Sequence, residues 1–223
     1  MPTTTMPAAT FHSPTRVMTS LLSASERRAL IWLAHRMPAW VTPDHLTGLA
    51  LVAMVGAGAA FWLASVTPVG LLLVVVCLAV NWFGDSLDGT LARVRHQERP
   101  RYGHYVDHVV DVAGTACLLG GMALSGHMTP VIALAVLAAY LMVTAEAFLA
   151  THARGVFTMS HFGVGPTELR ILLAAGAMGL ITHPKVRLFG EAVLLFNVGG
   201  VIAVAGLLVT FVRAALTNGR ALY

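Results

Sequence analysis

The sequence predicts an all-α integral membrane protein, with six transmembrane helices and an N-terminal amphipathic interfacial helix. Of its 223 residues, 57% are hydrophobic and only 11% are charged, whereas soluble domains carry about 25% charged residues. The mean hydropathy is +0.77. The apolar residues gather in runs that approach the roughly 20 residues a helix needs to cross a bilayer. One compact membrane domain is the simplest account of these features.

Six segments fit the length of a membrane span. They cover residues 46–66, 69–83 with a polar continuation, 103–124, 130–153, 168–181 and 189–212. We therefore divide the chain into a disordered N-terminus, an amphipathic juxtamembrane helix, a six-helix membrane domain and a C-terminal tail. These regions are 1–15, 16–40, 41–216 and 217–223. The first is small, polar and proline-rich, which is typical of disorder.

The juxtamembrane region combines apolar periodicity with positive charge. Apolar residues recur at Val17, Leu21, Leu22, Leu30, Leu33 and Ala34. Arg27, Arg28 and Arg36 lie among them. This pattern favours a helix lying on the membrane surface. The alternative is a solvated helix that packs against its own domain.

The basic residues predict the orientation of the chain. With six spans, one side receives Arg16, Arg27, Arg28, Arg36, Arg93, Arg95, Arg99, Arg101, Arg154, Arg170, Arg213 and Arg220. The other side receives only Lys185 and Arg187. Because positive loops stay inside, both termini should be cytoplasmic, and we expect a multi-pass protein of a bacterial inner membrane. The net charge of +4 then reflects topology and lipid headgroups, and argues against a nucleic-acid partner.

Two pairs of aspartates stand at the predicted cytoplasmic ends of neighbouring spans. Asp85 and Asp88 are three residues apart, and Asp107 and Asp111 are four apart, so each pair shares a helical face. Converging carboxylates repel one another unless a divalent cation holds them together. Oxygen ligands favour Mg²⁺ or Mn²⁺. Two such ions, about 3.5–4 Å apart, would suit transfer between phosphates.

Two other kinds of site compete with this interpretation. His104 and His108 interleave with Asp107 and Asp111 and could build a zinc site, although the aspartates alone account better for the spacing. Intramembrane carboxylates also occur in proton-coupled transporters. Against a transporter, the acidic residues cluster at one side instead of forming a path across the membrane, and the two halves of the chain show no inverted repeat.

The aspartates belong to a longer pattern that resembles a known family signature. The sequence reads Asp85-Ser-Leu-Asp88-Gly89-Thr-Leu-Ala92-Arg93, nine residues, Gly103, three residues, Asp107, three residues, Asp111. It resembles the motif D-x-x-D-G-x-x-A-R-x₈₋₉-G-x-x-x-D-x-x-x-D of the CDP-alcohol phosphotransferases, with all eight specified positions present. Residues 42–47 are similar to the family's Pro-Asn-x-x-Thr start of the first span, with Asp44 in place of the asparagine.

The resemblance implies a role for each motif residue. Asp85, Asp88, Asp107 and Asp111 would surround two Mg²⁺ or Mn²⁺ ions, and Asp111 would be the general base. The residues implied along the CDP group are Asp88, Gly89, Ala92, Arg93 and Gly103. The resemblance also implies a homodimer.

The resemblance implies a phospholipid-synthesis transferase that moves a substituted phosphate from a CDP-linked donor to an alcohol and releases CMP. CDP-diacylglycerol is the favoured donor. The alternative is an aminoalcohol phosphotransferase acting on diacylglycerol with CDP-choline or CDP-ethanolamine, because Thr167-Glu168 is similar to an element of that branch. An ordinary helix N-terminus explains the same two residues. The residues proposed near the acceptor are Glu146, Glu168, Arg154 and Arg170.

Overall fold

The structure is a computed structural model that describes residues 15–17, 23–154, 156–158 and 165–223. The N-terminus was predicted to be disordered over residues 1–15, and residues 1–14 of this region lie outside the described part of the chain. The amphipathic helix was expected from residue 16, but Thr15–Val17 form a short strand and the helix is described from Ser23. Residues 18–22 lie outside the described part.

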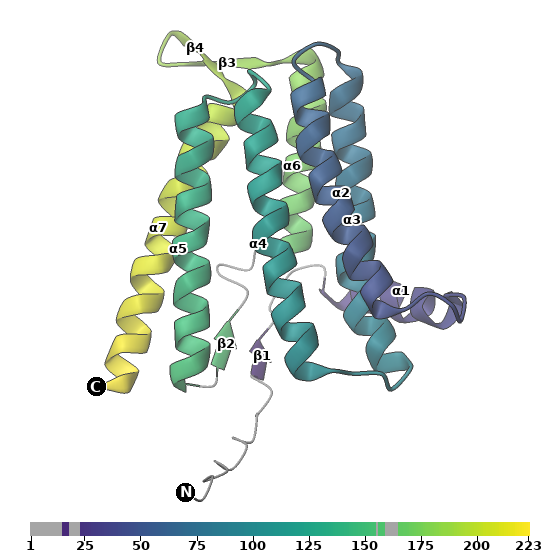
Figure 1. The fold of residues 1–223 in the computed structure, drawn as a ribbon. Coiled ribbons are helices and arrows are strands. Elements are labelled where there is room, and N and C mark those ends of the chain that lie inside the picture. Colours follow the sequence, from purple (N-terminus) through teal and green to yellow (C-terminus); the bar gives the residue numbers. More distant parts are fainter. Residues whose placement is uncertain (1–14, 18–22, 155, 159–164) are drawn as a thin grey trace, which may run out of the picture.

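Seven helices and two small sheets make up the described chain (Figure 1). The helices are α1 (Ser23–Arg36), α2 (Pro43–Leu63), α3 (Val69–Val94), α4 (Pro100–Leu124), α5 (Pro130–Arg154), α6 (Pro166–Thr182) and α7 (Leu195–Leu222). Strands β1 (Thr15–Val17) and β2 (Val156–Thr158) pair in parallel. Strands β3 (Lys185–Leu188) and β4 (Glu191–Leu194) form an antiparallel hairpin.

The predicted fold class is confirmed. Helices α2, α3, α4, α5 and α7 are each long and apolar enough to cross a membrane. The remaining predicted span is α6, which has 17 residues and is therefore only about 25 Å long. Figure 1 shows α6 running beside the other helices, with its lower end stopping well short of theirs.

Two predicted boundaries near the C-terminus differ from the structure. Residues 189–194, expected in the last span, belong to the β-hairpin, whose turn at Phe189 and Gly190 has positive φ angles of 52° and 90°. Residues 217–222, expected as a tail, continue α7. The side chain of Asn218 bonds to Glu146 and Arg154 on α5, and these contacts hold the last turns of the helix in place.

The closest packing in the bundle lies between α2 and α4. Gly58 faces the backbone of Cys117, and a Cβ atom at Gly121 would overlap the backbone of Gly58. Small residues allow membrane helices to approach each other this closely. Around the contact, Phe61 and Val74 are almost completely buried. This packing fixes α4, which carries Asp107 and Asp111, against α2.

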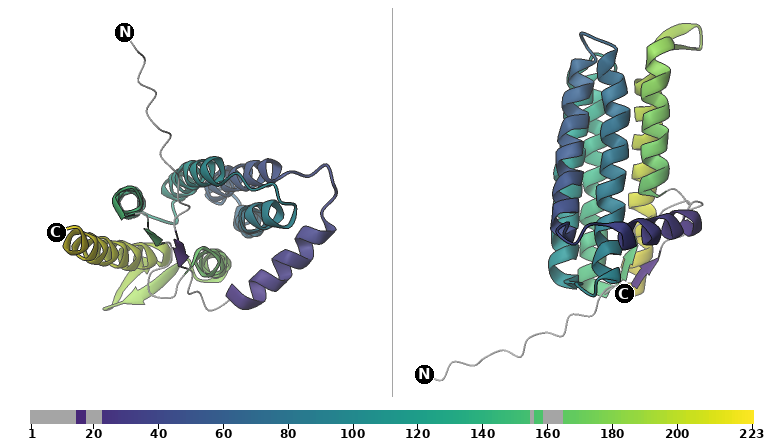
Figure 2. Two further views of the ribbon diagram at one scale, coloured as in Figure 1. Left: turned by 90° about the horizontal axis from the view of Figure 1, so that it is seen from below. Right: turned by 90° about the vertical axis from the view of Figure 1, so that its right-hand side faces the viewer.

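Helix α1 runs across the bundle at a steep angle to the long helices (Figure 2). Leu30 and Ala34 are buried in one cluster with Leu87 and Leu91 of α3. Another part of its surface exposes Trp32, with Arg36 stacked over the indole at 3.9 Å. The helix therefore packs one face on its own domain and leaves an aromatic and basic face available to a membrane surface.

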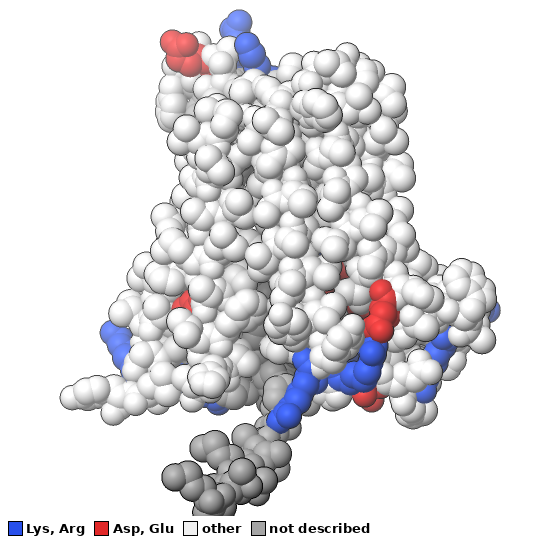
Figure 3. Space-filling model, in the orientation of Figure 1, with Lys and Arg blue, Asp and Glu red and all other residues white. Residues whose placement is uncertain are grey.

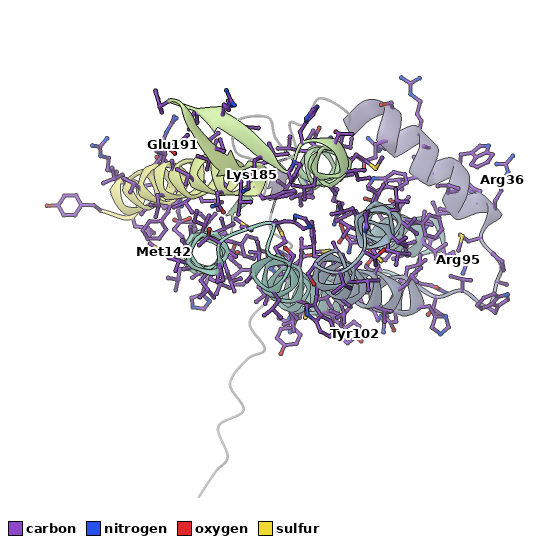
Figure 4. All side chains as sticks on the ribbon, turned by 90° about the horizontal axis from the view of Figure 1, so that it is seen from above. Arg36, Arg95, Tyr102, Met142, Lys185 and Glu191 are labelled. Carbon is purple, nitrogen blue, oxygen red and sulfur yellow. The ribbon has the colours of Figure 1, made fainter. Side chains whose placement is uncertain are left out.

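Charged side chains lie mainly at the two ends of the molecule (Figure 3). The C-terminus and strand β1, the first described segment, lie at the lower end of the bundle in Figure 1, and on the face drawn in Figure 3 most of the basic side chains gather at this end. The opposite end carries the hairpin with Lys185 and Glu191, labelled in the view from above in Figure 4. The separation matches the distribution of basic residues expected from the sequence.

Candidate active site

The four motif aspartates of α3 and α4 lie within electrostatic range of one another. Each is partly buried. Asp88 interacts electrostatically with Asp85 and Asp107, and Asp111 interacts with all three of the others. The short connection between α3 and α4 returns the second pair of aspartates toward the first, and their use as one shared metal site remains a prediction.

Asp88 accepts hydrogen bonds from a side chain of α2 and from the backbone of the next residue. The hydroxyl of Thr47 on α2 donates a hydrogen bond of 2.6 Å to one carboxylate oxygen. The backbone N–H of Gly89 donates to the other oxygen. The threonine belongs to the segment that resembles the family's start of the first span, so this segment supports the motif directly.

Position 44, where the chain departs from the family pattern, also has a partner. Asp44 forms an ion pair with Arg99, in the connection between α3 and α4. The hydrogen bond that the Arg99 guanidinium donates to this carboxylate is the main reason that the pKa of Arg99 is raised above its ordinary value. Both side chains are about half exposed, at 48% and 51%. The pair joins the start of α2 to the connection that leads into Gly103.

Asp85 is paired with Arg170 on α6. The guanidinium Nη2 lies 2.6 Å from a carboxylate oxygen of Asp85, and Nε donates to Asn81 Oδ1 at 2.7 Å. Asn81 in turn donates to the carbonyl of Ala50 at 3.0 Å. Within the described residues, the buried Nη1 of Arg170 has no hydrogen-bond partner. A cation with a remaining donor thus stands beside the aspartates.

The other three residues expected near the acceptor make contacts elsewhere. The Glu168 side chain accepts a hydrogen bond from the backbone N–H of Gly165 at 3.0 Å, which caps α6. Glu146 accepts from Asn218 at 2.7 Å, and Arg154 donates to the same asparagine. The Gly165–Glu168 hydrogen bond supports the interpretation of Glu168 as a residue of an ordinary helix N-terminus.

Three polar residues near the site were not singled out from the sequence. Asn81 lies one helical turn before Asp85 in an otherwise apolar stretch. This isolated polar residue is the sequence feature that could have identified it. Tyr140 on α5 lies close to Asp111, with Thr115 and Thr144 beside it. Glu26 on α1 contacts α3 and α6. Only the packing of distant segments brings Tyr140 and Glu26 to the site.

Open space surrounds the two motif glycines. A Cβ atom added at Gly89 would meet nothing closer than a terminal nitrogen of Arg93 at 3.6 Å, and one at Gly103 would meet nothing within 4 Å. Protein packing therefore does not require a glycine at either position. Glycine inside a helix costs about 1 kcal/mol relative to alanine, so the approach of a ligand is the better explanation for both.

The donor groups of this site suit a hard divalent cation. The four aspartates offer only oxygen ligands, which Mg²⁺ and Mn²⁺ prefer. In the described part of the chain, no three Asp, Glu, His or Cys side chains converge closely enough to hold an ion, and oxygens of Asp85 and Asp88 bond to Arg170 and Thr47. Holding a cation would require these carboxylates to turn toward one another.

A zinc site at the histidines receives no support from their contacts. The rings of His104 and His108 lie 4.3 Å apart, and Nδ1 of His108 is 2.6 Å from the backbone oxygen of His104. His108 also packs edge-on against Phe148 of α5. These contacts are those of a ring held within a helix interface.

A bundle of membrane-spanning helices with its acidic residues pooled at one end defines an integral membrane enzyme, and the carboxylate arrangement suits chemistry on phosphates. Comparison with known proteins specifies the class. The profile of the CDP-alcohol phosphatidyltransferase family matches residues 40–212. The chain belongs to this family and is a transferase of substituted phosphate groups.

The fold is also similar to a solved structure. The crystal structure of phosphatidylinositol phosphate synthase from Mycobacterium tuberculosis with CDP-DAG bound superposes with a TM-score of 0.63 at 21% identity. The similarity covers 86% of this chain and 94% of that chain. No curated protein matches the sequence.

Proposed function

We propose that the protein transfers a phosphatidyl group from CDP-diacylglycerol to an alcohol and releases CMP, in a reaction that depends on two Mg²⁺ or Mn²⁺ ions. The observation that carries the proposal is the grouping of four carboxylates from α3 and α4 within electrostatic range of one another, beside two glycines with open space around them. The crystal neighbour, which has CDP-DAG bound, supports a lipid donor.

The depth of the site also favours a lipid donor. Helix α1 contacts α3 at Trp82 and Ser86, which flank Asp85 in the sequence. If α1 lies on the membrane surface, as its composition predicts, the aspartates stand at the level of the lipid headgroups. A CDP-linked lipid carries its diphosphate at this depth while its acyl chains remain in the bilayer.

The residues take the following roles in the proposal. Gly89, Ala92, Arg93 and Gly103 lie along the CDP group, together with Asp88. The four aspartates would hold the cations, which would neutralise charge on the diphosphate. The alcohol oxygen attacks the phosphorus that carries diacylglycerol, and the bond from that phosphorus to the CMP oxygen breaks. Asp111 accepts the proton of the alcohol.

Arg170 is the residue best placed on the acceptor side. It is fixed by Asn81 and Asp85, and one buried nitrogen has no hydrogen-bond partner among the described residues. That nitrogen could donate to an oxygen of the acceptor or of the transferred phosphate. The aminoalcohol alternative is less favoured, because Thr167 bonds to Glu26 and Glu168 caps its own helix.

The proposal is tested with purified protein in lipid nanodiscs. Labelled CDP-diacylglycerol, CDP-choline and CDP-ethanolamine are each incubated with a panel of acceptors, which includes glycerol phosphate, inositol phosphate, serine and diacylglycerol. We expect CMP release and a new phospholipid from CDP-diacylglycerol when Mg²⁺ or Mn²⁺ is present, and neither after chelation. Turnover of CDP-choline or CDP-ethanolamine with diacylglycerol, and none of CDP-diacylglycerol, would replace this function with the aminoalcohol reaction.

A further inference from the structure

One carboxylate on α1 joins the two helices that form the Asp85–Arg170 pair. Oε1 of Glu26 accepts hydrogen bonds from Trp82 Nε1 at 2.7 Å and from Thr167 Oγ1 at 2.7 Å. The hydroxyl of Ser86 is a third donor at 3.4 Å. Trp82 and Ser86 lie on α3 and Thr167 on α6, and Figure 2 shows α1 passing beside both helices.

The N-terminal half of α6 has little apolar packing to hold it. The buried residues of this helix, Ala177 and Leu180, both lie in its C-terminal half. In the N-terminal half, Leu169, Ile171 and Leu172 are 51%, 54% and 67% exposed. Polar contacts at Thr167 and Arg170 must therefore determine where this half of the helix lies relative to α3.

The contacts of Glu26 are arranged around the ion pair. Thr167 and Arg170 are three residues apart and so share a face of α6. Ser86 directly follows Asp85, the partner of Arg170. Glu26 therefore touches α3 next to the aspartate and α6 one turn before the arginine, and it fixes both sides of the pair at once.

We propose that Glu26 is a positioning residue, which sets the N-terminal half of α6 against α3 so that Arg170 meets Asp85 in the geometry required for transfer. The inference rests on the proposed function of this site. Because Glu26 lies on α1, whose other face exposes Trp32 and several arginines, the position of Arg170 becomes coupled to the seating of the interfacial helix.

The first test measures position directly and needs no activity. Spin labels at Arg28→Cys on α1 and Leu172→Cys on α6, both exposed positions, report the distance between the helices in a background that lacks Cys77 and Cys117. Glu26→Ala should broaden the distance distribution. Glu26→Gln keeps a carbonyl oxygen that can accept from both Trp82 and Thr167, and should retain the narrow distribution.

The second test measures turnover of the unlabelled variants. We expect Glu26→Ala to lower kcat by about ten- to a hundred-fold, because small misplacements of reacting groups have effects of this size, and Glu26→Gln to restore most of it. Thr167→Val removes the same hydrogen bond from the other side. Combining it with Glu26→Ala should cost no more than Glu26→Ala alone, as for two residues that act through one contact.

The outcomes separate this inference from the function on which it rests. A wild-type protein that releases no CMP would refute the proposed function, while the distance measurement would still show whether Glu26 positions α6. In an active enzyme, an unchanged distance distribution in Glu26→Ala would overturn the inference, as would an unchanged kcat. Variants are compared only after size-exclusion chromatography shows a single folded species, and Glu26→Gln and Thr167→Val provide the test if the alanine variant does not fold.

Discussion

Single glycines in the bundle serve two different purposes. Gly121 lies against the backbone of Gly58, so a methyl group at this position would overlap that backbone. Gly89 lies in the aspartate motif, and a methyl group there would meet only the end of the Arg93 side chain. Packing requires the first glycine. No contact among the described residues requires the second, and we propose that it makes room for the CDP-linked donor.

This difference predicts opposite effects for the same substitution at the two positions. Gly121→Ala should destabilise the protein by about 1–3 kcal/mol or more, as expected when a tightly packed contact is overfilled, and should lower the thermal unfolding temperature. Gly89→Ala should leave that temperature unchanged or raise it slightly, but increase KM for CDP-diacylglycerol at least ten-fold. Normal donor affinity in Gly89→Ala would contradict the assigned approach of the donor.

Asp111 provides the sharpest test of a catalytic role. Asp111→Asn keeps the shape and one oxygen ligand but removes the proton acceptor. We expect kcat to fall by about 10²–10⁴-fold, the usual contribution of a general base, with CDP and Mn²⁺ binding largely retained in calorimetry. Wild-type turnover in this variant would exclude the residue as the base.

Asp88 should respond differently from Asp111. It is the aspartate bonded to Thr47 and to the backbone of Gly89, and its assigned role is to hold a cation and the CDP group. Asp88→Asn should therefore weaken CDP binding and raise the Mn²⁺ concentration required for activity together. If binding of the nucleotide and of the metal changed independently of each other, the shared role would be wrong.

At the level of elements, the link between α1 and α2 is held by Arg95, the residue that follows the last turn of α3. Nη2 of Arg95 donates to the carbonyls of Met37 and Pro38, each at 2.9 Å, and Nη1 donates to Val41 at 2.5 Å. These oxygens belong to the turn between α1 and α2, which follows Arg36, the last residue of α1. The sequence suggested only a topology charge at this position.

Loss of this contact should loosen α1 without unfolding the bundle. Arg95→Met keeps much of the side-chain length but leaves the carbonyls without their donor, at a cost of about 1–3 kcal/mol. We expect faster amide hydrogen exchange in residues 37–42, with exchange in α4 and α5 unchanged. Arg101→Met, in the first turn of α4 and exposed, is the matched control and should leave exchange in residues 37–42 unchanged.

For the whole molecule, the distribution of charge indicates one orientation in the membrane. The C-terminus and strand β1 lie at the lower end of the bundle, where basic residues gather on the face drawn in Figure 3, and the β3–β4 hairpin lies at the other end (Figure 1). From the positive-inside rule we propose that the aspartates and the C-terminus face the cytoplasm. A CDP-linked substrate made in the cytoplasm would reach the site from that side.

Cysteine labelling of intact cells tests this orientation. In a variant without Cys77 and Cys117, Lys185→Cys on the hairpin should react with a membrane-impermeant maleimide in intact spheroplasts. Arg220→Cys near the C-terminus should react only after permeabilisation. The reverse pattern would place the site on the outer face, and labelling of both positions in intact spheroplasts would exclude a single orientation.

The sequence alone determined the features that are encoded locally. Span length and apolar composition predicted the helical membrane fold, and spacings of three and four residues predicted that each aspartate pair shares a face. The short connection between α3 and α4 made it foreseeable that the two pairs would lie within electrostatic range of each other. The same local signals placed the last span and the tail incorrectly, because they contain no information on the β3–β4 pairing or on the contact of Asn218 with α5.

Tertiary structure decided which distant side chains complete the site. Nothing in the local sequence distinguished Arg170 from Glu146 or Arg154, or showed that Glu26 would reach both α3 and α6. These partners are separated from the motif by tens of residues, so their meeting depends on how whole helices pack. Periodicity fixes which face of a helix a residue occupies, but only the packed bundle fixes what that face meets.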